Sequence, residues 1–342
     1  MNLISNKSSD PKVLVLGSNR GNWHSSEKIQ FAESTSGIES WAYAFNGSHY
    51  YSLSANKKLI SMCDIIIANS NQGKNLKHLL KLAESRPANV KWVTLIEGSA
   101  EDYLKPMSFI RELFDSSDLI NCINLGTLSF FRAMTSSKVE YIGIPYPVEY
   151  VARQSIPFES RKKEIFICPF LTTRCHDYFA ASNLGLKMFG FEERLHRKIT
   201  NLPKLLMKYG SINPNFKINK ALDFYRDNNL SIFQSKTTEN YYKFVGNAYF
   251  WLNLDNRWTW ARYVLDAAAL RIPIITTSST SHAVELFPLT CLDDEFDIEK
   301  AEDLGRRLIQ DFDFYKQVAD VPLSKLEYLK AENMKKKLLD LL

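Results

Sequence analysis

The chain has 342 residues, more than the roughly 100–200 of one ordinary domain, so we expect two domains. It is 45% hydrophobic and 13% aromatic, with only 13 Gly and 12 Pro, which excludes disordered, collagen-like and low-complexity classes. The net charge, 43 − 38 = +5, permits an anionic ligand or surface without requiring one. No apolar stretch approaches the roughly 18–20 residues that cross a bilayer, and no secretory signal is visible. We therefore expect a cytoplasmic protein.

The cysteines are odd in number, scattered and never paired as C-x-x-C. In a chain without a visible signal, they are interpreted as free thiols. They are Cys63, Cys122, Cys168, Cys175 and Cys291.

The first half alternates buried strands with helices. Apolar runs of the parallel-strand type lie at 12–18, 63–70, 91–99, 118–126 and 139–147, with another expected strand at 48–54. Helical patterns lie between them at 71–86, 101–116 and 127–137. This alternation indicates βαβ units and a parallel, doubly wound sheet.

After a polar stretch at 148–162, interpreted as a linker, the pattern restarts. Strands are expected at 164–171, 248–255, 271–277 and 289–293, and helices at 176–189, 258–270, 297–311 and 323–341. Two consecutive α/β domains, each doubly wound, are the best interpretation.

Ligands of such sheets bind beyond the carboxyl ends of the strands, and two facing domains would place the site in the cleft between them. The loops that follow the expected strands carry no complete nucleotide-binding motif. Gly73-Lys74 lacks the other residues of a phosphate-binding P-loop, and the first loop has only Gly17 and Gly21 of a dinucleotide fingerprint. The six histidines lack metal-ligand spacing, so no metal site is expected.

The expected helix at 258–270 carries one charge pair. Arg262 and Asp266 lie at i and i+4, and the other residues from 261 to 270 are Ala, Val, Leu or Tyr. A charge pair on a buried helix needs a partner or a ligand. Two interpretations remain: a ligand site at the helix start, or a structural intrahelical salt bridge.

The run AYFWLNLDNRWTWARYVLDAAALRIPIITT resembles the donor-binding region of GT-B glycosyltransferases, in particular the retaining "group 1" superfamily. LINCINLGTLSFFRAM…VEYIGIPYPVEYV resembles the last unit of that family's first domain. The resemblance implies two Rossmann-like domains facing across a cleft: an acceptor domain (1–150), a donor domain (160–322) and a final helix (323–342) packing back on the first. It further implies transfer of a sugar from a nucleotide-diphosphate sugar to an acceptor hydroxyl, without a metal ion and with retention of the anomeric configuration.

The resemblance also suggests roles for individual residues. Asp266 matches the second acid of the family's E-x7-E motif, which would bind the donor's ribose hydroxyls, while Trp258 stands where the first acid belongs. Arg174, Asn256, Arg257 and Arg262 are predicted around the donor, with Arg174 and Arg262 near its diphosphate. Glu97 falls where relatives place a residue near the reacting sugar, and would position the acceptor, act as a base, or cap a helix. On the acceptor side we predict Gly17, Ser18 and Asn19.

The missing first acid leaves alternatives open: a non-catalytic GT-B-like binding protein, or a nucleotide-sugar epimerase on the same fold. Residues 192–220 hold seven Lys or Arg against two Glu. This basic segment is interpreted as a solvated helical face, with contact to an acceptor or a membrane surface as the alternative. A nucleic-acid partner is not expected.

Overall fold

A computed structural model describes residues 10–17, 21–25, 37–70, 75–98, 107–168, 176–191, 230–233 and 238–342. The contacts divide the chain into two compact units. The first comprises Met1–Val148, Arg257–Trp260 and Leu326–Leu342, and the second comprises Glu149–Asn256 and Ala261–Lys325. The short piece Arg257–Trp260 thus belongs to the first unit, although its neighbours in sequence belong to the second.

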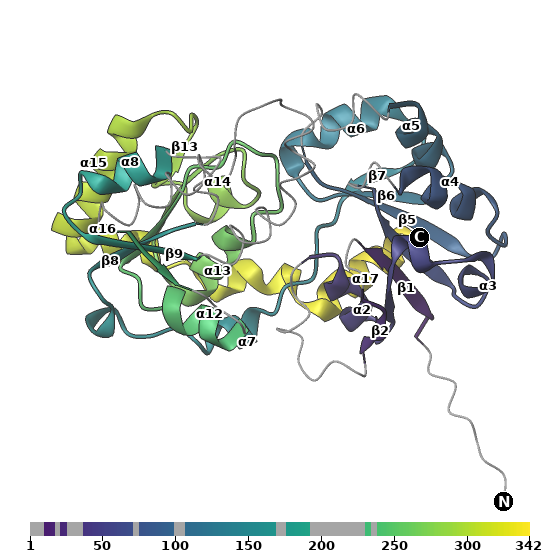
Figure 1. The fold of residues 1–342 in the computed structure, drawn as a ribbon, viewed down its shortest axis with the longest axis horizontal. Helices are drawn as coiled ribbons and strands as arrows, with labels where there is room; N and C mark the ends of the chain where they lie inside the picture. The colour runs from purple at the N-terminus through teal and green to yellow at the C-terminus, as the bar shows by residue number, and fades with distance from the viewer. Residues whose placement is uncertain are drawn as a thin grey trace, which may run out of the picture. The chain divides into compact units, whose positions relative to one another are not determined.

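The first unit contains a seven-stranded sheet of order β2-β3-β1-β4-β5-β6-β7, parallel except for β2 (Figure 1). The strands are β1 (Val13–Gly17), β2 (Trp23–His24), β3 (Ser48–Tyr51), β4 (Ile65–Asn69), β5 (Lys91–Ile96), β6 (Leu119–Cys122) and β7 (Val139–Tyr141). The central strands are almost wholly buried because helices cover both faces, which is why they appear in the sequence as continuous apolar runs.

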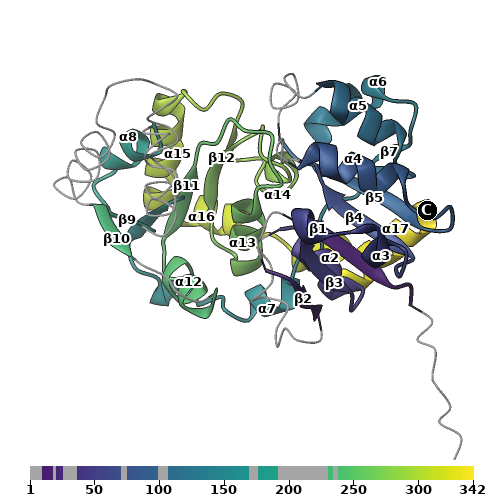
Figure 2. The same ribbon diagram turned by 45° about the vertical axis from the view of Figure 1, so that its right-hand side comes forward.

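The helices of this unit are α2 (Glu39–Ala44), α3 (Lys57–Ile60), α4 (Leu76–Glu84), α5 (Met107–Asp115), α6 (Leu128–Met134) and α17 (Ala331–Leu341), with 3-10 turns at Ser52–Ser54 and Leu125–Thr127. Helices α4 and α5 pack side by side, and α17 packs on α2 (Figures 1 and 2). The core between the sheet and α4–α6 includes Trp92, Phe114 and Phe131, all fully buried.

The second unit contains a six-stranded parallel sheet of order β10-β9-β8-β11-β12-β13. Its strands are β8 (Glu164–Ile167), β9 (Lys187–Phe191), β10 (Leu230–Phe233), β11 (Phe250–Asn253), β12 (Ile274–Thr277) and β13 (Cys291–Leu292). Strands β9 and β10 follow β8 in sequence and lie on one side of it in the sheet, and the next strand, β11, lies on the other side of β8. The topological switch point therefore lies between β8 and β11.

The helices of the second unit are α7 (Val148–Ala152), α8 (His176–Ser182), α12 (Thr238–Val245), α13 (Arg262–Leu270), α14 (Ala283–Leu286), α15 (Ile298–Gln310) and α16 (Phe312–Ala319). Helices α8 and α15 pack together on one face of the sheet, and α12 and α13 lie on the other (Figures 1 and 2). A 3-10 turn at Phe158–Ser160 precedes β8, and another at Leu323–Leu329 precedes α17.

The predicted α/β class with two doubly wound parallel sheets is confirmed. Several details of the sequence prediction are wrong. The helix predicted from 258 begins at Arg262, because Ala261 has left-handed backbone angles (φ 50°, ψ 60°). The helix predicted over 176–189 ends at Ser182, and residues from Lys187 form β9, which was not expected, nor was β10. The single final helix is a 3-10 turn followed by α17. Within the described residues, no helix is both long and apolar enough to span a membrane.

Candidate functional site

The carboxyl edge of the second sheet has a polar residue at its switch point. Strand β11 runs through three buried apolar residues and ends at Asn253, which is 1% exposed and lies beside Thr276 of β12. The Asn253 side-chain oxygen is buried and has no hydrogen-bond partner in the described part of the chain. Buried polar atoms are normally paired, so an orphaned acceptor at a switch point marks a candidate ligand site.

The loops after β11 and β12 are tied to each other by hydroxyl groups. The Thr277 and Ser279 hydroxyls both donate to the Asp255 carbonyl oxygen, and the Leu254 amide donates to Asp177 Oδ1 at 2.6 Å. These bonds hold the edge in one conformation, so groups on it are oriented before any ligand arrives.

Two residues at this edge have left-handed backbone angles, Ala261 before α13 and His282 before α14. His282 is 8% exposed, and burial lowers its pKa to about 3. The imidazole is therefore neutral at physiological pH. The positively charged side chain that α13 contributes at this edge is Arg262.

The predicted pair on α13 is part of a four-residue cluster. Arg262 Nε lies 3.6 Å from Asp266 Oδ1, so the predicted salt bridge at i, i+4 is present. Asp266 accepts hydrogen bonds from Tyr242 at 3.0 Å and from Tyr241 at 3.4 Å, and Arg262 Nη2 donates to the Tyr242 hydroxyl at 2.7 Å. Burial, reinforced by the carboxylate of Asp266, raises the pKa of both tyrosines, so their hydroxyls stay protonated. We name these four residues the α13 cluster.

Trp258, which stands where the E-x7-E resemblance would place the first acid, has a structural role in the first unit. The Gly98 amide donates to the Trp258 carbonyl at 3.0 Å, and the Asn124 side chain donates to the Thr259 carbonyl at 3.2 Å. The Trp258 ring lies against Gly126, where an added Cβ would come within 2.1 Å of it, and a Cβ added at Gly143 would come within 2.4 Å of the Trp260 ring. We call Arg257–Trp260 the tryptophan strap.

The residues predicted around the donor do not all belong to one unit. Arg257 belongs to the first unit, whereas Asn256, Arg262 and Asp266 belong to the second. Asn256 and Arg257 are both exposed.

On the first unit, Gly17 and Glu97 both lie at carboxyl ends of strands. Gly17 ends β1, and an added Cβ there would come within 2.4 Å of His49 Nε2, so the glycine is needed for this packing. Glu97 directly follows β5 and is half-buried. The acceptor and catalytic roles of these two residues stay predictions.

Other predicted residues lie outside the described part of the chain: Ser18, Asn19, Arg174 and the basic segment 192–220. Among the described residues, no group of three or more His, Cys, Asp or Glu side chains is arranged to hold a metal ion.

Three polar residues of this region are not among the residues predicted from the sequence. Asn253 breaks the apolar run of its own strand, a signal that was available. Tyr241 and Tyr242 lie on an ordinary amphipathic helix, α12, more than 20 residues before Asp266, and carried no signal.

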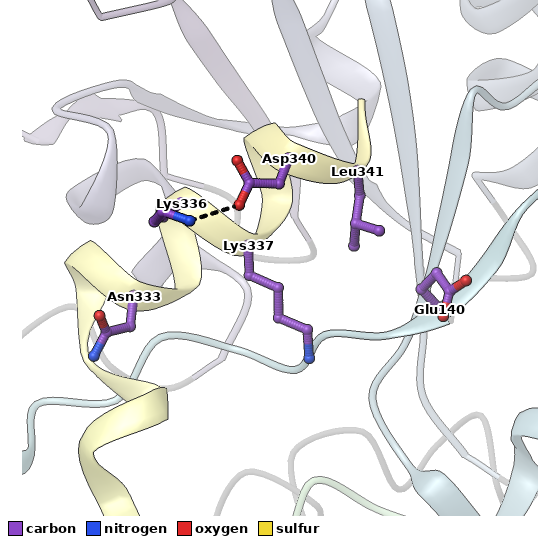
Figure 3. Close-up of a pocket in the computed structure, with 6 residues that line it drawn as sticks. All are labelled: Glu140, Asn333, Lys336, Lys337, Asp340 and Leu341. Atoms are coloured by element: carbon purple, nitrogen blue, oxygen red, sulfur yellow. Dashed lines mark hydrogen bonds and ion pairs between the residues drawn. The ribbon is translucent and has the colours of Figure 1, made fainter.

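Two cavities lie away from the predicted residues. One, of about 290 Å³, lies between α17 and Glu140 of β7 in the first unit (Figure 3). Its charges are already paired: Lys336 with Asp340, Lys337 with the Tyr141 carbonyl, and Glu140 with Arg132. The other, of about 590 Å³, is lined by Phe158, Arg161 and Tyr315 in the second unit, where Arg161 donates to the last carbonyls of α13 and caps that helix. We assign neither cavity a role.

No protein-family model matches the sequence, and no curated protein matches it. Solved structures do match, and they are glycosyltransferases of the GT-B fold, the fold of this chain. The α,α-trehalose 6-phosphate synthase of Burkholderia multivorans aligns with a TM-score of 0.64 at 9% identity, covering 97% of this chain and 98% of that one.

Two further matches widen the comparison. The sucrose-phosphate synthase of Thermosynechococcus elongatus gives a TM-score of 0.58 at 9% identity, covering 81% of this chain and 72% of that one. An α-glucosyltransferase in complex with UDP and a 13-mer DNA gives 0.58 at 11%, covering 97% and 99%. At these identities the likeness is one of fold.

Proposed function

We propose that the protein is a glycosyltransferase that moves a sugar from a nucleotide-diphosphate sugar to an acceptor hydroxyl, with retention of anomeric configuration and without a metal. The observation that supports this most is the alignment of nearly the whole chain with glycosyltransferases of the GT-B fold. The cytoplasmic location expected from the sequence belongs to the same proposal.

In this proposal the carboxyl edge of the second sheet binds the donor. Backbone amides at the start of a helix favour an anion, and Arg262 stands in the first turn of α13. Together with Arg174 it would neutralise the negative charge that develops on the leaving diphosphate, which is the task a metal ion performs elsewhere. Asn256 and the orphaned oxygen of Asn253 would accept hydrogen bonds from the donor.

The first unit would bind the acceptor. Gly17 ends β1 and Glu97 follows β5, so both lie at the carboxyl edge of the first sheet. The roles predicted for Ser18 and Asn19, the next two residues in the sequence, belong to the same proposal. A half-buried carboxylate there would position the acceptor hydroxyl or take up its proton.

The matched solved structures indicate which donor nucleotide to test first. One matched trehalose-phosphate synthase is described as UDP-forming, another was solved with UDP-2-fluoro glucose, and the α-glucosyltransferase was solved with UDP. UDP and UDP-glucose are therefore the first ligands to test.

A second function is favoured by one observation. The residue where the resemblance would place the first acid is Trp258, which offers no carboxylate to the donor sugar, and its ring packs against Gly126 in the first unit. A binding protein of the GT-B fold would bind a nucleotide diphosphate without turning over its sugar conjugate.

The experiment is a thermal-unfolding screen with UDP, GDP, ADP and dTDP and their glucose conjugates, because a ligand that binds the native state raises the melting temperature. We expect one base to stabilise the protein, with most of the shift lost in Arg262→Gln. The matched control is Arg306→Gln on α15, an exposed arginine of the same unit. Stabilisation by none of the eight compounds would overturn the proposal.

A radiolabelled sugar conjugate of that base then separates the remaining functions. Release of the diphosphate with the sugar on an acceptor or on water supports a transferase. Binding without release supports the binding protein, and an epimerised donor supports the epimerase.

A further inference from the structure

We infer that Asp266 is a positioning residue: it orients Arg262 toward the donor's diphosphate through the Tyr242 hydroxyl, and it does not bind the ribose. The inference rests on the proposed function and assigns a specific role to one residue of the donor site. It departs from the role that the E-x7-E resemblance implies for this acid.

The carboxylate of Asp266 is covered. The residue is 1% exposed, its Oδ1 accepts from Tyr242 and lies beside Arg262, and its Oδ2 accepts from Tyr241. Because Asp266 is almost inaccessible, a ribose hydroxyl could reach either oxygen only if the side chains that cover the carboxylate were displaced. Displacement would leave a buried tyrosine hydroxyl without its acceptor, which costs free energy.

The Tyr242 hydroxyl has a forced direction of hydrogen bonding. A guanidinium can only donate and a carboxylate can only accept. The single hydroxyl proton therefore points to Asp266 Oδ1 at 3.0 Å, and the hydroxyl oxygen accepts from Arg262 Nη2 at 2.7 Å. Because Tyr242 is fully buried, its ring fixes the hydroxyl in place, and the carboxylate fixes its direction.

Arg262 is the charged residue of the cluster that reaches solvent. Its side chain is 28% exposed, against 1% for Asp266. The 3.6 Å between Arg262 Nε and Asp266 Oδ1 exceeds hydrogen-bond length, so the shorter tether of the guanidinium is the one through Tyr242. The cluster thus presents one oriented cation in the first turn of α13 and keeps its anion behind it.

The experiment measures by calorimetry the binding of UDP, 2′-deoxy-UDP, 3′-deoxy-UDP and UMP to the full chain and to three variants. Tyr242→Phe removes the tether of Arg262, and Asp266→Asn keeps an acceptor but removes the charge. Tyr241→Phe is the matched control, because it removes the longer hydrogen bond to the same carboxylate and leaves the Tyr242–Arg262 bond. If another base stabilises the protein in the screen above, its corresponding compounds replace these.

We expect Tyr242→Phe to weaken UDP binding roughly 10-fold or more, the range for a hydrogen bond to a charged group. The UDP-to-UMP affinity ratio should fall in Tyr242→Phe and hold in Tyr241→Phe. Loss of a ribose hydroxyl should weaken binding by the same factor in Asp266→Asn as in the unaltered protein. Thermal unfolding without ligand checks that each variant is folded.

Two results would overturn the inference. If the deoxy compounds bind Asp266→Asn as well as UDP does, but bind the unaltered protein more weakly, Asp266 contacts the ribose. If Tyr242→Phe weakens UDP and UMP equally, the cluster is only structural. Failure of the proposed function is distinct, since the unaltered protein would then bind no nucleotide, and the inference would fall with it.

Discussion

Replacing Gly126 by Ala should destabilise the first unit through the tryptophan strap. A Cβ at Gly126 would lie 2.1 Å from Cζ3 and 2.7 Å from Cε3 of the Trp258 ring. Ordinary carbon contacts are about 3.5–4.0 Å, so the ring must move by more than an ångström or leave its place. Overpacking of this kind costs about 1–3 kcal/mol.

The cost should depend on the ring that causes it. In the Trp258→Ala background the added methyl group has room. Exchanging Gly126 for Ala should then stabilise the protein, by less than about 1 kcal/mol. A double-mutant cycle should therefore give a coupling of about 1–3 kcal/mol between the two positions. Gly21→Ala is the matched control, because no atom of the described residues lies within 4 Å of an added Cβ there.

Urea unfolding of the four proteins measures the cycle, and thermal unfolding checks it, at roughly 2–4 °C per kcal/mol for a unit of this size. If Gly126→Ala costs the same with and without the Trp258 ring, the strap does not sit against Gly126 and our account of the missing acid is wrong.

Two further predictions concern pH. Burial favours a higher pKa for Asp118, but the Trp92 amide at 2.8 Å and the cations Lys91 and Arg86 at 3.0 Å outweigh it and lower the pKa. This stabilisation is present above the unfolded value of about 3.9 and is lost as pH falls. Asp118→Asn should thus lower the urea midpoint at pH 7 but far less at pH 3, and an equal loss at both would contradict this. The lowered pKa of His282 means that the unfolded chain binds a proton there below about pH 6.5 while the folded chain does not until about pH 3. The free energy of unfolding should therefore decrease as the pH is lowered from about 6.5 to about 3, and it should decrease less in His282→Asn. Asparagine tolerates the left-handed backbone angles of this position. An identical dependence on pH in the two proteins would refute this.

The strands that the sequence revealed are those covered on both faces. Strands β1 and β4 are almost entirely apolar, and β5 is apolar apart from Lys91 and Thr94, because helices pack on both sides of them, so composition marks them. Strands β9 and β10 escaped prediction because they are short edge-side strands, KMFGF and LSIF, without a long apolar run. The start of α13 escaped because the left-handed angles of Ala261 arise from tertiary packing, since alanine has no local preference for them.

The charge pair of α13 illustrates how far local spacing reaches. Positions i and i+4 share a helix face, so the contact between Arg262 and Asp266 followed from the sequence. Its setting did not, because Tyr242 comes from another helix, 24 residues earlier, and sequence distance gives no information about such a neighbour.

By itself, the sequence determined what depends on neighbours along the chain: the α/β class, two doubly wound sheets, most strand positions and a charged pair on a buried helix. Only the tertiary structure decided what depends on packing between distant segments. It placed Trp258 against Gly126 and bonded Thr259 to Asn124, 135 residues away. It also surrounded Asp266 with tyrosines. The physical reason is that periodicity records which face of an element is buried, whereas the partner that buries it is chosen by the fold.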